Sequence, residues 1–186
     1  MKNNLTEKDI KTINKWAEKY GIKELKINDK EKIFNLKQLC IFNTNIKHIP
    51  AAIFKLTNLK SFSIGCNNLN RLPKEICNLI NLKKIYIHCE NLKSLPNEIE
   101  KLTNLESIHI ECENLKQLPK EIHNLIKLKR FDIDCPNSEN FPDGIAKLIN
   151  LETIYIINSN GKLNLQYLIG GIVKLNNLKS LYLDIE

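Results

Sequence analysis

The sequence contains very little arginine. Arg71 and Arg130 are the only two, so the 28 basic residues are almost all lysine. Nucleic-acid-binding surfaces usually carry arginine forks or a dense basic stripe. Here the lysines recur singly along the whole chain, although they give a formal net charge of +7. The composition therefore predicts no nucleic-acid partner.

Long hydrophobic runs are also missing. No apolar stretch approaches the roughly 20 residues that a membrane-spanning helix needs. The segment from Met1 to Leu5 leads into charged residues and not into the apolar core of a signal peptide. Lys2 excludes N-myristoylation, which requires glycine at that position. We therefore expect no membrane partner and a cytoplasmic location, in which the six cysteines stay reduced.

Features of an active site are scarce as well. With six glycines, the chain has no glycine-rich phosphate loop, and it has no C-x-x-C pair. No nucleophile stands at a recognisable spacing from a base. We predict that the protein is not an enzyme and has no catalytic residues, no metal and no cofactor.

The sequence does contain an internal repeat. Six leucines, each 23 residues after the one before, open the pattern L-x-x-[LIF]-x-I. They are Leu36, Leu59, Leu82, Leu105, Leu128 and Leu151. The first part of each unit alternates apolar and polar residues, which is typical of a strand. The second part often begins with proline and shifts toward spacings of three and four, which suits a helical turn. One unit cannot bury its own apolar edge, so we expect stacked units with one continuous core and a parallel sheet on one wall.

Three units contain a segment of the form L-P-x-E-I, namely Leu72–Ile76, Leu95–Ile99 and Leu118–Ile122. With these segments and the 23-residue period, residues 22–186 resemble the leucine-rich-repeat family. The resemblance implies an α/β fold, a right-handed solenoid or horseshoe with a concave parallel β-sheet and short helical or 3-10 turns on the convex side. It also implies recognition of a partner protein through the concave strands. We divide the single domain into an N-terminal capping region with a helix and a short opening strand (1–35), six repeats (36–177) and a partial seventh repeat (178–186).

One column of residues departs from the family pattern. The family's usual asparagine appears one place late, and two residues before it lie four cysteines. They are Cys66, Cys89, Cys112 and Cys135. In one interpretation the inward alternation runs two residues longer, so that Ile87, Cys89 and Asn91 face the core and the asparagines satisfy backbone groups. In the other, the usual frame holds and the thiols lie on the concave surface. Strands about 4.8 Å apart spread the four sulfurs too widely for one zinc ion.

The two ends of the chain differ. Residues 6–20 predict an amphipathic capping helix, with Thr6 as N-cap and Asp9 in the place of the capping-box glutamate. Ile22, Leu25 and Ile27 then suggest the opening strand. The last interval is 27 residues, and we expect its extra residues near 159–164, either as a plain loop or as an insertion that contacts a partner.

At the other end, Leu178, Leu181 and Leu183 predict a seventh strand with no cap after it. An uncovered strand edge favours pairing with another chain.

The extended alternation places a cluster of aromatic and charged residues on the concave wall. The candidate partner-binding residues are Tyr86, His88, His109, Glu111, Arg130, Asp132, Asp134 and Tyr155. Such residues together on one rigid face favour protein recognition, and the alternative is a merely solvated sheet face. Our first hypothesis is a non-enzymatic module that binds a basic or mixed-charge protein. The second is an assembly module that forms a weak homodimer through its C-terminal edge strand.

Overall fold

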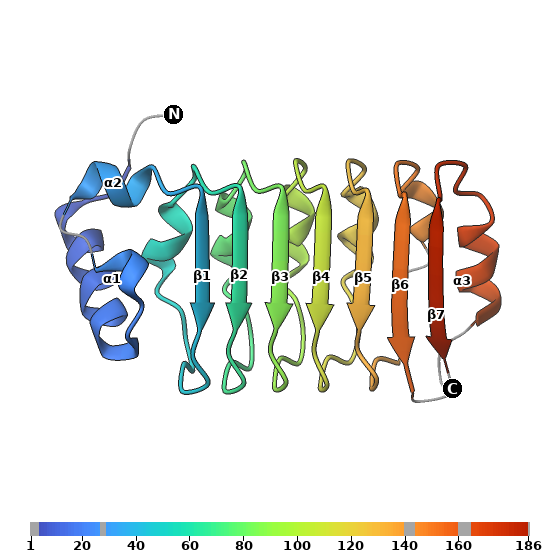
Figure 1. Cartoon of the computed structure of the whole chain (residues 1–186), viewed down its shortest axis with the longest axis horizontal. Coiled ribbons are helices and arrows are strands. Elements are labelled where there is room, and N and C mark those ends of the chain that lie inside the picture. Colours follow the sequence, from blue (N-terminus) through green and yellow to red (C-terminus); the bar gives the residue numbers. More distant parts are fainter. Residues whose placement is uncertain (1–3, 27–28, 140–143, 160–164, 186) are drawn as a thin grey trace.

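The computed structural model describes residues 4–26, 29–139, 144–159 and 165–185. Seven strands within these residues form one parallel sheet in the order of the sequence, β1-β2-β3-β4-β5-β6-β7 (Figure 1). The strands are β1 Gln38–Phe42, β2 Ser61–Gly65, β3 Lys84–His88, β4 Ser107–Glu111, β5 Arg130–Asp134, β6 Thr153–Asn158 and β7 Ser180–Ile185. Each residue of β1 to β5 pairs with the residue 23 positions later, as the leucine period predicts. The fold is therefore an α/β solenoid built from one repeating strand-and-turn unit.

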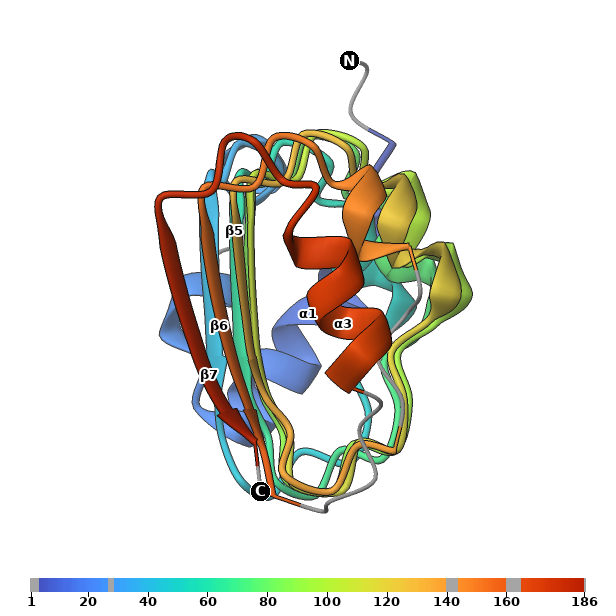
Figure 2. The same cartoon turned by 90° about the vertical axis from the view of Figure 1, so that its right-hand side faces the viewer.

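A second layer of short helices lies behind the sheet, and the two layers are separate when the molecule is viewed from its end (Figure 2). Most are 3-10 helices, namely η2 Ala51–Lys55, η3 Lys74–Asn78, η4 Asn97–Lys101, η5 Lys120–Asn124 and η6 Ile145–Lys147. A proline immediately precedes η2 through η5. Proline fixes φ near the helical value and has no N–H to lose, so it suits this entry position.

The core lies between the two layers and includes the cysteine column. Cys66, Cys89 and Cys135 are completely buried and Cys112 nearly so, and all four thiols are free. The extended alternation is thereby confirmed as far as the cysteines. Burial raises the pKa of Cys66 to about 11 and of Cys89 and Cys135 to about 12. These thiols are packing residues, because a neutral buried sulfur is a small apolar group.

The asparagine column after the cysteines was only half correctly predicted. Asn91 is exposed, so its expected inward position is wrong. Its backbone role is confirmed, since Asn91 Nδ2 donates to the carbonyl oxygen of Asn67 at 2.8 Å. Asn114 and Asn137 donate in the same way to the carbonyls of Glu90 and Glu113. Each amide thus ties one turn to the previous one from the protein surface.

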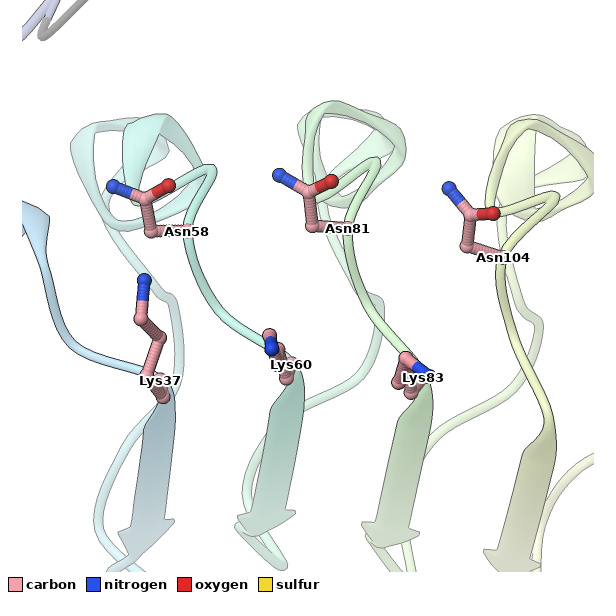
Figure 3. A pocket seen from close by; sticks show the side chains of 6 residues that line it. All are labelled: Lys37, Asn58, Lys60, Asn81, Lys83 and Asn104. Atoms are coloured by element: carbon pink, nitrogen blue, oxygen red, sulfur yellow. The ribbon is translucent and has the colours of Figure 1, made fainter. Parts of the chain in front are cut away.

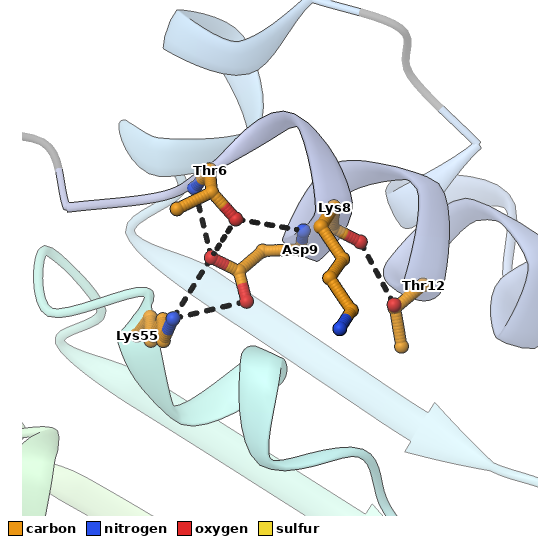
Figure 4. Close-up of polar contacts among 5 residues, drawn as sticks. All are labelled: Thr6, Lys8, Asp9, Thr12 and Lys55. Atoms are coloured by element: carbon orange, nitrogen blue, oxygen red, sulfur yellow. Dashed lines mark hydrogen bonds and ion pairs between the residues drawn. The ribbon is translucent and has the colours of Figure 1, made fainter.

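Helix α1 (Glu7–Tyr20) covers the N-terminal end of the core, and it begins with the expected capping box. Thr6 Oγ1 accepts from the Asp9 backbone N–H at 3.1 Å, and the Thr6 N–H donates to Asp9 Oδ2 at 2.8 Å (Figure 4). Asp9 also pairs with Lys55 Nζ of η2, 2.8 Å from its Oδ2. The cap is therefore fastened to the first repeat by charge as well as by packing.

The expected opening strand is wrong. Lys23–Leu25 form the 3-10 helix η1, and Ile27 lies outside the described residues. A short helix, α2 (Lys30–Phe34), follows, with Asp29 capping its first backbone N–H groups. Leu25 is fully buried, so its apolar signal was correct although the type of element was not.

The C-terminal end has a different helix and a less protected strand. Helix α3 (Leu165–Ile172) takes the place of a 3-10 turn, and it contains the Gly170–Gly171 pair. Most of the 159–164 segment, where the extra residues were expected, lies outside the described residues. The predicted seventh strand is present as β7. Among the described residues, no helix is long and apolar enough to cross a bilayer.

Candidate functional site

The eight predicted site residues all lie on the exposed face of the sheet, on β3 to β6. Tyr86, His109, Asp132 and Tyr155 are register partners and form one row across these strands. His88, Glu111 and Asp134 form a second row, and Arg130 lies two residues before Asp132, on the same face. We call these eight residues the central patch. The parallel register brings together side chains that are 23 residues apart in the sequence.

Glu111 links the side chains in the N-terminal half of the central patch. Its Oε2 accepts from the Tyr86 hydroxyl at 3.2 Å and lies 2.9 Å from His88 Nδ1. The rings of Tyr86 and His109 stack at 4.4 Å between centroids, with planes 10° apart. The stack and the shared carboxylate hold these side chains in place, so a partner would meet a preorganised surface.

Asp132 lies at the centre of the patch and is unusually buried for a carboxylate, with 5% of its surface exposed. Its Oδ2 accepts from Arg130 Nε at 2.6 Å and lies 3.6 Å from His109 Nδ1. Its Oδ1 is buried and, among the described residues, has no hydrogen-bond partner. A buried acceptor without a donor is costly, so Asp132 is held in this position at the expense of one unmade hydrogen bond.

Sequence analysis missed one member of the site. Tyr182 of β7 is the register partner of Tyr155, and the two rings stack at 4.6 Å with planes 11° apart. Tyr182 remains 47% exposed. Its signal was the pattern of the seventh strand, in which Tyr182 follows Leu181 as Tyr155 follows Ile154. A second aromatic stack therefore borders the patch on its C-terminal side.

The carboxylates of the patch affect one another. Burial, Glu111 and Asp184 raise the pKa of Asp134, with His109 acting in the opposite direction. Burial would also raise the pKa of Glu111, but His88, Tyr86 and His109 outweigh it and the pKa falls. Burial and the Glu111 charge raise the pKa of Tyr86. The raised pKa of Asp134 reflects burial first and the nearby negative charges second, and a cation bound beside it would oppose both.

The N-terminal side of the same face is chemically plainer. Cys40, Ser61 and Ser63 line it, and the ring of Phe42 lies against Gly65, where a β-carbon would collide with it. Phe42 is one of the most exposed large apolar residues that the structure describes. The recognition chemistry therefore gathers on β3 to β7 and not on β1 and β2.

The histidines and carboxylates of the face do not converge. In the part of the chain that the structure describes, no group of three or more histidine, cysteine, aspartate or glutamate side chains is arranged to hold a metal ion. The geometry instead offers aromatic faces, a buried carboxylate oxygen and negative charge.

The comparisons with known proteins agree with this architecture. A family model described as "Leucine-rich repeat region" matches residues 74–186, more than half of the chain. The chain belongs to the leucine-rich-repeat family. No curated protein matches it.

Three solved structures are similar to this chain. A plant peptide hormone receptor, RGFR1, solved in complex with RGF2, is 22% identical with a TM-score of 0.55, over 75% of this chain and 27% of the receptor chain. A leucine-rich-repeat protein of Leptospira interrogans is 22% identical with a TM-score of 0.39, over 82% of this chain and 55% of that one. The leucine-rich-repeat domain of the type III effector XopL is 20% identical with a TM-score of 0.46, covering 82% and 70%. This chain thus spans about a quarter of the receptor chain and about half of the Leptospira protein.

Proposed function

We propose that the protein is a non-enzymatic binding module that recognises a partner protein through the central patch. Leucine-rich repeats generally serve as protein-interaction scaffolds, and membership of that family supports the general function. The observation that carries the specific site is Asp132, whose buried Oδ1 has no donor among the described residues and lies in a row between aromatic rings.

The chemistry of the patch favours a basic group on the partner. Glu111, Asp132 and Asp134 bring three carboxylates together on neighbouring strands. Of the cationic side chains in the patch itself, Arg130 contacts Asp132 through Oδ2 and leaves Oδ1 unpaired. A lysine or arginine of the partner would pair with the partly exposed carboxylates of Glu111 and Asp134, while the stacked rings supply rigid apolar area.

Peptide display followed by titration tests this proposal. Peptides selected on the intact chain should contain basic and aromatic residues. Replacing Tyr86 and Tyr155 with alanine should weaken their binding by about thirtyfold or more, the scale of interface hot spots. Asp132→Asn should also weaken binding, because an amide places a partial positive charge where the cation sits.

The matched control is the double variant Gln38→Ala and Ser61→Ala, which alters the same face on β1 and β2 outside the patch. It should bind the selected peptides as the unchanged chain does. Equal binding by the Tyr86 and Tyr155 double variant would show that the site lies elsewhere.

A second candidate function is self-association through the C-terminal end, and the exposure of Leu181 favours it. Its register partner Ile154 is completely buried, whereas Leu181 is 47% exposed. Among the described strands, β7 pairs with β6 alone. Exposed apolar side chains beside an unpaired strand edge promote contact with a second chain.

Equilibrium sedimentation tests this candidate. A concentration series into the high micromolar range should show a weak dimer, and Leu181→Lys should abolish it. A monomer at every concentration, with β7 amides protected from hydrogen exchange, would rule it out.

A further inference from the structure

A second surface lies at the edge of the sheet where the strands begin, away from the central patch. The residue immediately before each strand forms a row along this edge. The row is Lys37, Lys60, Lys83, Glu106, Lys129, Glu152 and Lys179. The backbone fixes its spacing, since the N–H of Lys60 donates to the carbonyl of Lys37 and the N–H of Lys83 to that of Lys60. Successive members are therefore about one strand apart, roughly 4.8 Å.

A groove lies beside the N-terminal end of this row. Lys37, Lys60 and Lys83 form one wall of a groove of about 360 Å³, and Asn58, Asn81 and Asn104 of the preceding turns form the other (Figure 3). Each asparagine is held by its neighbour, because its Nδ2 donates to a backbone carbonyl of the previous repeat at 2.8–3.2 Å. We call this feature the lysine groove. Its asparagine wall is a rigid part of the fold.

The charges along the row change from one half to the other. In the C-terminal half the lysines are paired, because Lys179 Nζ lies 2.6 Å and Lys129 Nζ 4.0 Å from the Glu152 carboxylate. In the lysine groove no carboxylate lines the walls, and the described residues place no acidic group within ion-pair distance of Lys37 or Lys60. Lys37 and Lys60 are thus the lysines of the groove that no described carboxylate neutralises, whereas Lys83 at its end is paired with Glu106.

The contact at the end of the groove favours a carboxylate as the ligand of these lysines. Where the row reaches its first acidic residue, Lys83 Nζ binds Glu106 Oε1 at 2.7 Å. One lysine of the groove thus already binds a carboxylate, which comes from the next residue of the row. We propose that the lysine groove binds an acidic segment of a partner protein, with its carboxylates beside Lys37 and Lys60 as Glu106 lies beside Lys83.

The dimensions and surroundings favour a short protein segment over a nucleic acid. Three lysines span roughly 10 Å, which an extended chain covers in about three residues. The groove contains no arginine, and the row becomes acidic at Glu106. A continuous polyanion running on along the row or over the face would meet Glu106, Glu111 and Asp134, whereas three or four consecutive acidic side chains fit the groove alone.

Fluorescence anisotropy with the full chain tests the proposal. The probe is a labelled glycine–serine peptide that carries four consecutive glutamates, and its twin carries four glutamines. The glutamate peptide should bind and the glutamine peptide should not. The double variant Lys37→Gln and Lys60→Gln should weaken binding by on the order of tenfold, with an unchanged urea midpoint because both side chains are exposed.

The matched control is Lys74→Gln with Lys120→Gln, which removes the same charge from exposed positions of η3 and η5. It should leave binding unchanged. An equal loss in both double variants, or no binding by the unchanged chain, would overturn the proposal. Tighter, groove-dependent binding of a single-stranded RNA of equal charge would overturn the choice of partner. Asp132→Asn should not affect this peptide, which separates the test from that of the central patch.

Discussion

The two ends of the solenoid differ in how completely the core is covered. At the N-terminal end, α1 lays Ile13, Trp16 and Ala17 over the core of the first repeat. Trp16 Nε1 donates to the carbonyl of His48, so the ring's polar atom is also satisfied. At the C-terminal end, Leu181 and Tyr182 of β7 each remain nearly half exposed. A repeat array has a continuous core, and in the described residues that core is covered by α1 at one end and partly exposed at β7 at the other.

The difference predicts that stability is graded along the molecule. Each repeat contacts its neighbours alone, so an end can open without the rest. The N-terminal end is held by α1, with packing, a capping box and the Asp9–Lys55 pair. Opening should therefore begin at β7 and move toward the centre.

The largest expected effect comes from comparing two register partners at the C-terminal end. Ile154→Ala creates a cavity in the core and should lower the free energy of unfolding by about 2–5 kcal/mol. Leu181→Ala removes a side chain that is already 47% exposed, so its cost should be below about 1.5 kcal/mol. Urea unfolding of both variants measures the contrast.

If Ile154→Ala does not fold, Ile154→Val is the milder substitute, with an expected cost of about 0.5–1.5 kcal/mol. A large cost for Leu181→Ala would mean that this end is covered in solution. In that case the cost should depend on protein concentration, which identifies a second copy as the cover.

A smaller effect is expected from the fastening of the N-terminal cap. Asp9→Ala removes one half of the capping box and the partner of Lys55, and should cost about 1–2 kcal/mol. Glu7→Ala is the control, because Glu7 is also acidic and in the first turn but lies outside the box. A similar loss in both variants would assign the effect to the helix dipole instead.

The same contact predicts a pH dependence. Burial acts to raise the pKa of Asp9, but hydrogen bonds from Lys55 and Thr6 outweigh it and the folded pKa is lowered. A carboxylate with a lowered folded pKa contributes stability above its unfolded pKa and loses it as the pH falls through the folded value. The difference between the unchanged chain and Asp9→Ala should therefore be constant near neutral pH and shrink below about pH 4.

The repeat could be predicted from the sequence because the spacing of the buried residues determines where each strand begins. Leucines 23 apart set the strand register, and once the register is known the face of every strand residue follows, including that of Tyr86 and Asp132. The same period located the cysteine column, but the sequence left open whether its thiols face the core or the surface, and the structure buries them. Outside the period the pattern failed, and residues 23–25 formed a 3-10 helix.

Contacts made by long side chains could not be predicted. Register places Lys83 beside Glu106, but it does not say that Lys83 bonds there while Lys37 and Lys60 have no ion-pair partner among the described residues. The unpaired Oδ1 of Asp132 likewise depends on which oxygen Arg130 takes. Such details are decided by rotamers and local competition, which a repeat pattern does not encode.

The smallest expected effect is a difference in labelling rate among the buried thiols, and it reports directly on which end opens first. Cys135 of the turn after β5 lies toward the uncovered end, and Cys66 after β2 lies toward α1. With a thiol reagent at low urea and mass spectrometry, Cys135 should react about three to ten times faster than Cys66. Cys40 and Cys77, which are partly exposed, should react before either.

Thiol acidity cannot produce this order, since burial raises the pKa of Cys135 to about 12 and that of Cys66 to about 11, which favours Cys66. Equal rates at Cys66 and Cys135 would mean that the solenoid opens as one unit, and a faster Cys66 would mean that α1 is the weaker end.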